Sequence, residues 1–267
     1  MYQILWHQQR IGRITGSVAH SVLHTDINNF SESLLMKICC PNTSVINAPS
    51  LNWGRDHESV ANKIYTSLIT GSQLPSDVSF PNNIYVLVPT GHIGCSVMPA
   101  GFRISSKMSY IGVSADGYVK CDCQGTGVIE IKCPNTDRNT PLSTLLTKPD
   151  ILFNANYNVR RNHKYYCQIQ LEMYVCGVLY CDVVIWQPDS ILVVRVERDD
   201  SFLTDVLPNL RTAWIKHILP ELLTKSIQTA PRASASAATC TVTTASASGN
   251  DYRFCVCKTD IGGRMIG

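Results

Sequence analysis

The chain has 267 residues, of which 45% are hydrophobic and 16% are charged, with 23 Lys and Arg against 20 Asp and Glu. This composition is typical of a globular protein and argues against global disorder, and a formal net charge of +3 is too small to indicate a general affinity for nucleic acid or membranes. Because no apolar stretch reaches the ~18 residues of a membrane span and residues 1–10 lack the features of a signal peptide, we expect an intracellular protein without membrane contacts, whose 12 Cys are mostly reduced.

The apolar spacing predicts the secondary structure in chain order. We expect a helix that Thr15 or Ser17 caps and that runs to Leu23, helices over 31–38 and 52–69, a strand over 84–88, strands over 111–119 and 128–133 with a hairpin loop at 121–127, a helix over 163–178, strands over 183–186 and 191–196, and a helix over 202–223 that Pro208 and Pro220 interrupt. Helices before and after a strand-rich centre indicate an α/β fold with a mixed sheet.

The C-terminal part of the chain has a different composition. Residues 229–250 are almost entirely Ala, Ser and Thr, which offer no large apolar side chains to offset the entropy of ordering, so we expect a flexible linker. Residues 1–228 then form one domain, and residues 251–267 begin another.

The strongest functional signal is Ser114-Ala-Asp116-Gly117 followed by Glu130-Ile-Lys132. Alternation along a strand places Glu130 and Lys132 on one face, where Asp116 from the partner strand can reach them. Two carboxylates held together need a cation, and oxygen ligands favour a hard one such as Mg²⁺. Lys132 can orient or deprotonate a water there if its pKa is lowered. Asp-Gly is common in turns and Glu-x-Lys on solvent-facing strands, but Asp-Gly within a strand pattern favours a functional site.

Four segments in order resemble the YqaJ-type viral recombinase and lambda-exonuclease-like branch of the PD-(D/E)xK nucleases. They are Arg10-Ile-Gly-Arg-Ile-Thr-Gly-Ser17, Trp53-Gly-Arg-Asp-His-Glu58, Ser114-Ala-Asp-Gly117 with Glu130-Ile-Lys132, and Lys164-Tyr-Tyr-Cys-Gln-Ile-Gln170. The resemblance covers about residues 8–200 and implies a restriction-endonuclease-like core, in which helices flank a mixed central sheet.

The resemblance also implies roles for single residues. Asp116, Glu130 and the main-chain carbonyl of Ile131 would be metal ligands, Glu58 would lie near the metals, Lys132 would be the catalytic lysine, and Gln168 would position the attacking water or Lys132. The cofactor would be Mg²⁺ or Mn²⁺, as two ions about 4 Å apart.

Arg10, Ser17 and Ser114 match positions at which the family holds a 5′-phosphate. A planar Arg donor and a hydroxyl near a helix start suit such a group, although Ser17 has the alternative of being only a helix cap. The resemblance thus implies a 5′-to-3′ exonuclease that acts on duplex DNA ends in recombination or repair. The alternatives are a structure-specific endonuclease and a catalytically weak DNA-binding module tethered to chromatin.

Two sets of cysteines invite a zinc interpretation. Cys255 and Cys257 resemble the start of a PHD finger, but two ligands cannot close a zinc site, so zinc and histone-tail binding in a nucleus would require a complete finger in a longer parent protein. Cys121, Cys123 and Cys133, with a histidine such as His92, form the weaker alternative. The resemblance also allows a homo-oligomer, since relatives include ring-shaped trimers.

Overall fold

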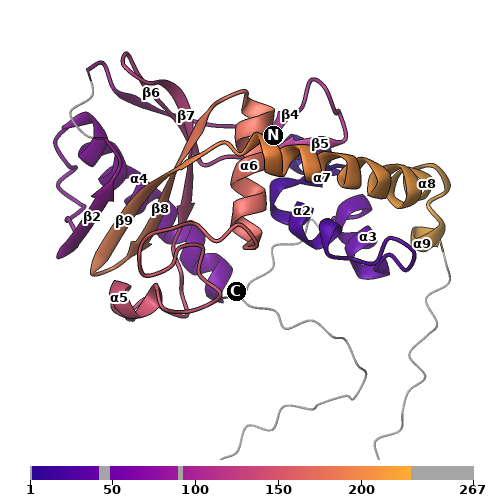
Figure 1. Ribbon diagram of the computed structural model, residues 1–267, viewed down its shortest axis with the longest axis horizontal. Helices are drawn as coiled ribbons and strands as arrows, with labels where there is room; N and C mark the ends of the chain where they lie inside the picture. The colour runs from indigo at the N-terminus through magenta and orange to yellow at the C-terminus, as the bar shows by residue number, and fades with distance from the viewer. Residues whose placement is uncertain (1, 42–48, 90–92, 230–267) are drawn as a thin grey trace, which may run out of the picture.

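The structure is a computed structural model that describes residues 2–41, 49–89 and 93–229 (Figure 1). The elements are α1 (Tyr2–Arg10), β1 (Ile14–Thr15), α2 (Gly16–Leu23), α3 (Glu32–Cys39), α4 (Pro49–Thr70), β2 (Asn83–Leu87), β3 (Ser96–Pro99), β4 (Arg103–Ile104), β5 (Ile111–Val113), β6 (Gly117–Cys121), β7 (Gly125–Lys132), α5 (Leu142–Leu145), α6 (Lys164–Cys176), β8 (Tyr180–Gln187), β9 (Ser190–Glu197), α7 (Asp200–Ala213), the π-helical segment η1 (Trp214–Ile218), α8 (Leu219–Thr224) and α9 (Ser226–Thr229). His92, Cys255, Cys257 and nearly all of the predicted linker lie outside the described residues.

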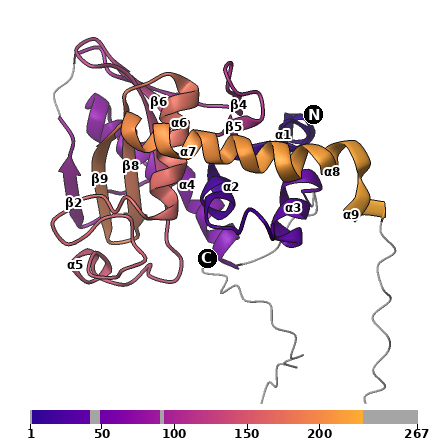
Figure 2. The same ribbon diagram turned by 45° about the vertical axis from the view of Figure 1, so that its right-hand side comes forward.

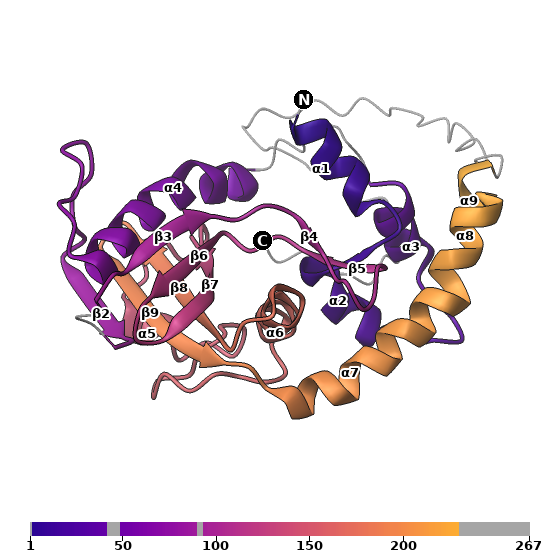
Figure 3. The same ribbon diagram turned by 90° about the horizontal axis from the view of Figure 1, so that it is seen from above.

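The larger sheet has six strands in the order β2-β9-β8-β7-β6-β3. It is mixed, because β2 runs parallel to β9 and β7 parallel to β8, whereas the other neighbouring pairs are antiparallel. The central strands β8 and β9 are rich in Val and Ile and almost entirely buried, as expected for strands that are covered on both faces. Seen from above, α4 lies along one side of this sheet and α6 along the other (Figure 3).

The two faces of β7 have different neighbours. Ile129 shares a hydrophobic cluster with Tyr65 of α4, whereas Val128 packs in the cluster that contains Ile169 of α6. Because side chains alternate along a strand, Glu130 lies on the same face as Val128 and is directed toward α6.

A second sheet, with three strands in the order β1-β5-β4, belongs to a largely helical part of the protein. Its buried side chains, such as Ile14 and Ile111, share one hydrophobic cluster with residues of α2, α3, α6 and α7. The segments α7, η1 and α8 follow one another as a single long helical rod along this part (Figure 2).

The predicted α/β class with a mixed central sheet flanked by helices is confirmed. The single strand predicted over 111–119 is wrong, because β5 and β6 belong to different sheets and residues 114–116 pass between them. Pro208 does not interrupt its helix but lies inside α7, and Pro220 occupies the first turn of α8, where its missing N–H costs little. None of the described helices combines the length and apolarity that a bilayer span requires.

Candidate active site

The β6–β7 hairpin fixes Asp116. This residue directly precedes β6, and its backbone N–H donates to the carbonyl of Ile129 at 3.0 Å. Its side-chain Oδ2 accepts a hydrogen bond from the backbone N–H of Ile131 at 2.7 Å. The carboxylate is therefore held across the hairpin by the backbone of the partner strand.

Glu130 and Lys132 lie side by side on the face of β7 that α6 covers. Glu130 is 1% exposed, and its Oε1 forms an ion pair with Nζ of Lys132, whose side chain is 24% exposed. The ring of Tyr165 on α6 lies against the same ammonium, with Nζ 4.7 Å from the ring centroid. The predicted meeting of Glu130 and Lys132 is thus observed, and Tyr165 is a neighbour of the lysine that the sequence did not assign.

Helix α6 contributes two further side chains to this region. Nε2 of Gln168 donates to Oε1 of Glu130 at 2.5 Å and to Oε1 of Glu172 at 2.9 Å. Glu172 is 1% exposed and was missed by sequence reasoning, although its spacing of four from Gln168 places both residues on one helix face. The start of α2 packs here as well, because a Cβ on Gly16 would lie 3.1 Å from Cγ of Gln168 and 3.6 Å from Oε1 of Glu172.

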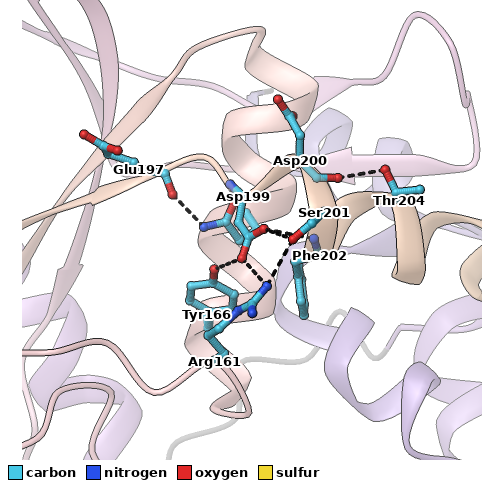
Figure 4. Close-up of polar contacts among 9 residues, drawn as sticks. Arg161, Tyr166, Glu197, Asp199, Asp200, Ser201, Phe202 and Thr204 are labelled. Carbon is cyan, nitrogen blue, oxygen red and sulfur yellow. Dashed lines mark hydrogen bonds and ion pairs between the residues drawn. The ribbon is translucent and has the colours of Figure 1, made fainter.

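The opposite side of α6 is anchored where β9 meets α7. Gln170 is fully buried; its Nε2 donates to the carbonyl of Glu197 at 2.9 Å, and its Oε1 accepts from the N–H of Asp199 at 2.7 Å. The Asp199 carboxylate accepts from the Tyr166 hydroxyl at 2.6 Å and forms an ion pair with Arg161 (Figure 4). These contacts fix the axial position of α6 and so the place of Gln168.

The carboxyl groups of the site affect one another. Burial and the Glu130 carboxylate raise the pKa of Asp116 to about 7. Burial, followed by the effect of Glu130, raises the pKa of Glu172 well above its usual range, and burial with Asp116 raises that of Glu58. Because each raised pKa disfavours the carboxylate form, a cation at this site would stabilise the ionised groups.

Burial and the neighbouring carboxylates act on the pKa of Lys132 in opposite directions. Burial alone would lower the pKa of Lys132, but the Glu130 and Asp116 carboxylates outweigh burial and raise it. The lysine therefore keeps its proton in the metal-free protein. Deprotonation of a water by Lys132, one of the two roles considered from the sequence, would require burial and a bound metal together to lower this pKa; in the metal-free protein burial does not bring it below its usual value.

The residues present fit a hard divalent cation. Oε2 of Glu130 is buried and has no hydrogen-bond partner among the described residues, and such an oxygen is costly unless something pairs with it. The predicted ligand set combines this carboxylate with Asp116 and the carbonyl of Ile131, all oxygen donors suited to Mg²⁺ or Mn²⁺. Within the described ranges, no three Asp, Glu, His or Cys side chains are arranged as ready ligands; the predicted set contains only two such side chains.

Glu58 lies on α4 at the mouth of the site. A cavity of about 680 Å³ is lined by Glu58 and Lys132, together with Lys148, Lys164 and Tyr165. A second hollow of about 600 Å³, on the side of α4 and β3, is lined by Glu58 and Asp116. The site is therefore open to two cavities, one beside Lys132 and one beside Asp116, and Glu58 lines both.

The candidate phosphate ligands are only partly brought together. Nη2 of Arg10 donates to Oγ1 of Thr15 at 3.5 Å, and the same oxygen lies 3.2 Å from Oγ of Ser17. Thr15 is the residue that precedes the first turn of α2, so the view of Ser17 as the helix cap is wrong. Ser114 follows β5 and is half-buried; among the described residues no hydrogen bond joins it to Arg10 or Ser17.

The zinc alternative within the domain is wrong. Cys121 and Cys123 lie at the β6–β7 turn with their sulfurs 3.5 Å apart, whereas Cys133 follows the far end of β7. At about 3.3 Å per residue, a strand of this length keeps Cys133 far beyond reach of a shared ion.

Two comparisons with known proteins found matches, one with a family model and one with solved structures of similar fold. The model of the YqaJ-like viral recombinase domain matches residues 5–178. The crystal structure of LHK-Exo in complex with dAMP has a TM-score of 0.57 and 21% identity, covering 84% of this chain and 97% of that one. The structure of an alkaline exonuclease (LHK-Exo) from Laribacter hongkongensis has a TM-score of 0.55 and 20% identity, with the same coverage. No curated protein sequence matches.

Proposed function

Because the chain belongs to the YqaJ-like viral recombinase domain family, we propose that it is a divalent-metal-dependent deoxyribonuclease that hydrolyses duplex DNA from its ends, in the 5′-to-3′ direction. The observation that carries this proposal is the meeting of Asp116, directly before β6, with Glu130 on the paired strand β7, beside Lys132 and Gln168. The similarity in fold to LHK-Exo, described as an alkaline exonuclease, supports the exonuclease class.

Asp116, Glu130 and the carbonyl of Ile131 would hold the cation. When bound, Mg²⁺ or Mn²⁺ would supply an activated water and neutralise charge on the leaving oxygen of the phosphodiester. The raised pKa of Asp116 fits this role, since a carboxyl destabilised as an anion gains most from a cation.

Lys132 and Gln168 would act on the reacting groups. The ammonium of Lys132, which the pKa direction keeps protonated, would stabilise negative charge on the phosphoryl oxygens. Gln168 would hold Glu130 in place through its 2.5 Å hydrogen bond. The Tyr165 ring limits the motion of the Lys132 side chain, so the ammonium is preorganised for this task.

The proposed end recognition depends on the first turn of α2. Ser17 there is linked through Thr15 to the guanidinium of Arg10, and a helix start with a hydroxyl and an Arg suits a terminal phosphate. Gly16 brings this turn against Gln168 and Glu172, so a 5′-phosphate at Ser17 would lie close to the proposed metal ligands. The cavity offers room for the continuing DNA strand and has Lys164 at its wall, whereas Lys148 there is paired with Asp137.

The test is degradation of linear, 5′-phosphorylated duplex DNA with and without Mg²⁺, beside a closed circle and the Lys132→Ala variant. We expect metal-dependent loss of only the linear DNA, and no loss with the variant. Cutting of the circle would favour a structure-specific endonuclease. Intact DNA with folded wild-type protein, after Mn²⁺ has also been supplied, would favour a DNA-binding module and overturn the proposal. The proposed activity on DNA ends would suit a role in recombination or repair.

A further inference from the structure

Glu172 is a buried carboxyl group to which the proposed chemistry assigns no part. It lies on α6 and is 1% exposed. Its Oε1 accepts from Nε2 of Gln168 at 2.9 Å, whereas its Oε2 is buried without a hydrogen-bond partner among the described residues. A buried oxygen without a partner lowers stability, so packing alone does not account for an acid at this position.

The same nitrogen of Gln168 also donates to Oε1 of Glu130 at 2.5 Å. An amide nitrogen has two hydrogens, and here each has a carboxyl acceptor. The two ends of a Gln amide have nearly the same shape, and the Glu130 carboxylate already favours the NH₂ group on its side. The oxygen of Glu172 is a second acceptor for the same nitrogen and adds to this preference.

If the amide of Gln168 turned over, its carbonyl oxygen would face the carboxylate of Glu130 and repel it. Glu130 would then lose one of the two groups that hold its Oε1, the other being Lys132. The contact between Gly16 and both Gln168 and Glu172 closes this arrangement from the side of α2. The orientation of a proposed metal ligand therefore depends in part on a residue that shares its hydrogen-bond donor.

We propose that Glu172 is a positioning residue, which fixes the amide of Gln168 so that this amide in turn holds Glu130 ready for the cation. The catalytic consequence rests on the proposed nuclease function, whereas the effect on cation binding does not. Groups that orient metal ligands commonly change affinity or activity by ~10–100-fold when they are removed.

The experiment compares Glu172→Gln, which retains an oxygen acceptor for Gln168, with Glu172→Leu, which retains only the volume. Mn²⁺ binding is measured by calorimetry on the full chain, and melting temperature is measured without metal. We expect Glu172→Leu to weaken Mn²⁺ binding by ~10-fold or more. Its melting temperature should not fall below that of wild type, because removal of a buried oxygen without a partner offsets the lost bond from Gln168. Glu172→Gln should bind Mn²⁺ nearly as wild type does.

Gln170→Leu is the matched control on the same helix. Gln170 is equally buried, but both of its polar atoms have partners, so this variant should melt at a lower temperature than wild type. A Glu172→Leu variant that also melts lower, or that binds Mn²⁺ as wild type does, would overturn the proposal by giving Glu172 a purely structural role.

A double-mutant cycle with Gln168→Ala separates this path from other effects. The cycle compares Glu172→Leu, Gln168→Ala and the variant with both substitutions. If Glu172 acts through Gln168, the double variant should have the same Mn²⁺ affinity as whichever single variant binds Mn²⁺ less tightly. Additive losses would contradict the proposed path. In cleavage assays the loss in Glu172→Leu should appear in kcat rather than in KM for DNA. If wild type does not cleave DNA at all, the proposed nuclease function fails. The Mn²⁺ binding and melting data still decide the role of Glu172 in that case.

Discussion

Oδ2 of Asp116 accepts a hydrogen bond from the backbone N–H of Ile131 at 2.7 Å, which ties the residue before β6 to the middle of the site on β7. The carboxylate thus has a structural partner as well as a proposed metal. In Asp116→Asn the amide oxygen can still accept this bond, whereas the negative charge is lost. We expect turnover to fall ~10³-fold while the melting temperature is kept or raised. Near wild-type turnover in a folded variant would remove Asp116 from the ligand set.

The stability of the metal-free protein should depend on pH through Asp116. Its pKa is raised to about 7 in the folded state, against about 4 in an unfolded chain. Between these values the folded state binds more protons, so stability falls as pH rises from about 4 to about 7 and then levels off. Thermal melts in a chelator across this range should show the decline, and Asp116→Asn should reduce it.

Metal ions should reverse this dependence. A cation binds the ionised carboxyl, so Mg²⁺ or Mn²⁺ should raise the melting temperature more at pH 8 than at pH 5.5. An equal shift at both values, or none at pH 8, would argue against a cation at Asp116.

The preference for a 5′-phosphate should depend on Arg10. Its guanidinium reaches Thr15, beside Ser17, and charge-assisted bonds to phosphate are strong. We expect Arg10→Ala to lower kcat/KM on 5′-phosphorylated ends by ~10–100-fold and to abolish the preference over 5′-hydroxyl ends. Arg13→Ala is the matched control, because Arg13 donates to the carbonyls of Ser109 and Gln9 instead. Equal use of both ends by wild type would already contradict the assignment.

The close contact at Gly16 makes this position sensitive to a single methyl group. A Cβ there would lie 3.1 Å from Cγ of Gln168, so Gly16→Ala must displace Gln168 by a few tenths of an ångström. We expect turnover to fall several-fold with little change in melting temperature. In Gly54→Ala, by contrast, the new Cβ meets nothing within 4 Å inside α4, and the helix should gain ~0.5–1 kcal/mol. Unchanged turnover in Gly16→Ala would show that Gln168 tolerates the shift.

Asp199 should contribute to stability without taking part in the chemistry. Burial would raise the pKa of Asp199, but bonds from Ser201, Tyr166 and the N–H of Phe202 outweigh it and lower the pKa. The contribution is therefore present at neutral pH and is lost as pH falls below about 4. Asp199→Ala should cost ~1–3 kcal/mol in the free energy of unfolding, and Asp199→Asn, which still caps α7, should cost less. Denaturant unfolding measures both.

The hairpin with its acidic and lysine residues could be predicted from sequence because strand alternation is a local rule. Asp116 and Gly117 are poor strand formers, and they mark the place where the chain passes from one sheet to the other. That change of sheet could not be predicted, because β5 pairs with β1 near the start of the chain, whereas β6 pairs with its sequence neighbour β7. The short strands β1, β3 and β4 carry too few residues to show a period.

The acidic partner of Gln168 illustrates a different limit. Sequence reasoning placed Gln168 on the helix that faces the sheet but did not single out Glu172, one turn later. The spacing of four was visible, whereas the burial of Glu172 depends on Gly16 at the start of α2, more than 150 residues earlier in the chain. The raised pKa of Lys132 likewise depends on the carboxylates of Glu130 and Asp116. Only the fold brings both of them close to the lysine.

The two glutamines of α6 limit how the length of this helix can vary. Gln168 faces the metal ligands and Gln170 faces the β9–α7 junction, and each residue of an α-helix advances about 100° around the axis. One residue inserted or deleted between them would turn the Gln168 side away from Glu130 while the junction held the rest of the helix in place. Substitutions in α6 can be compensated by neighbouring side chains, but a change in its length cannot.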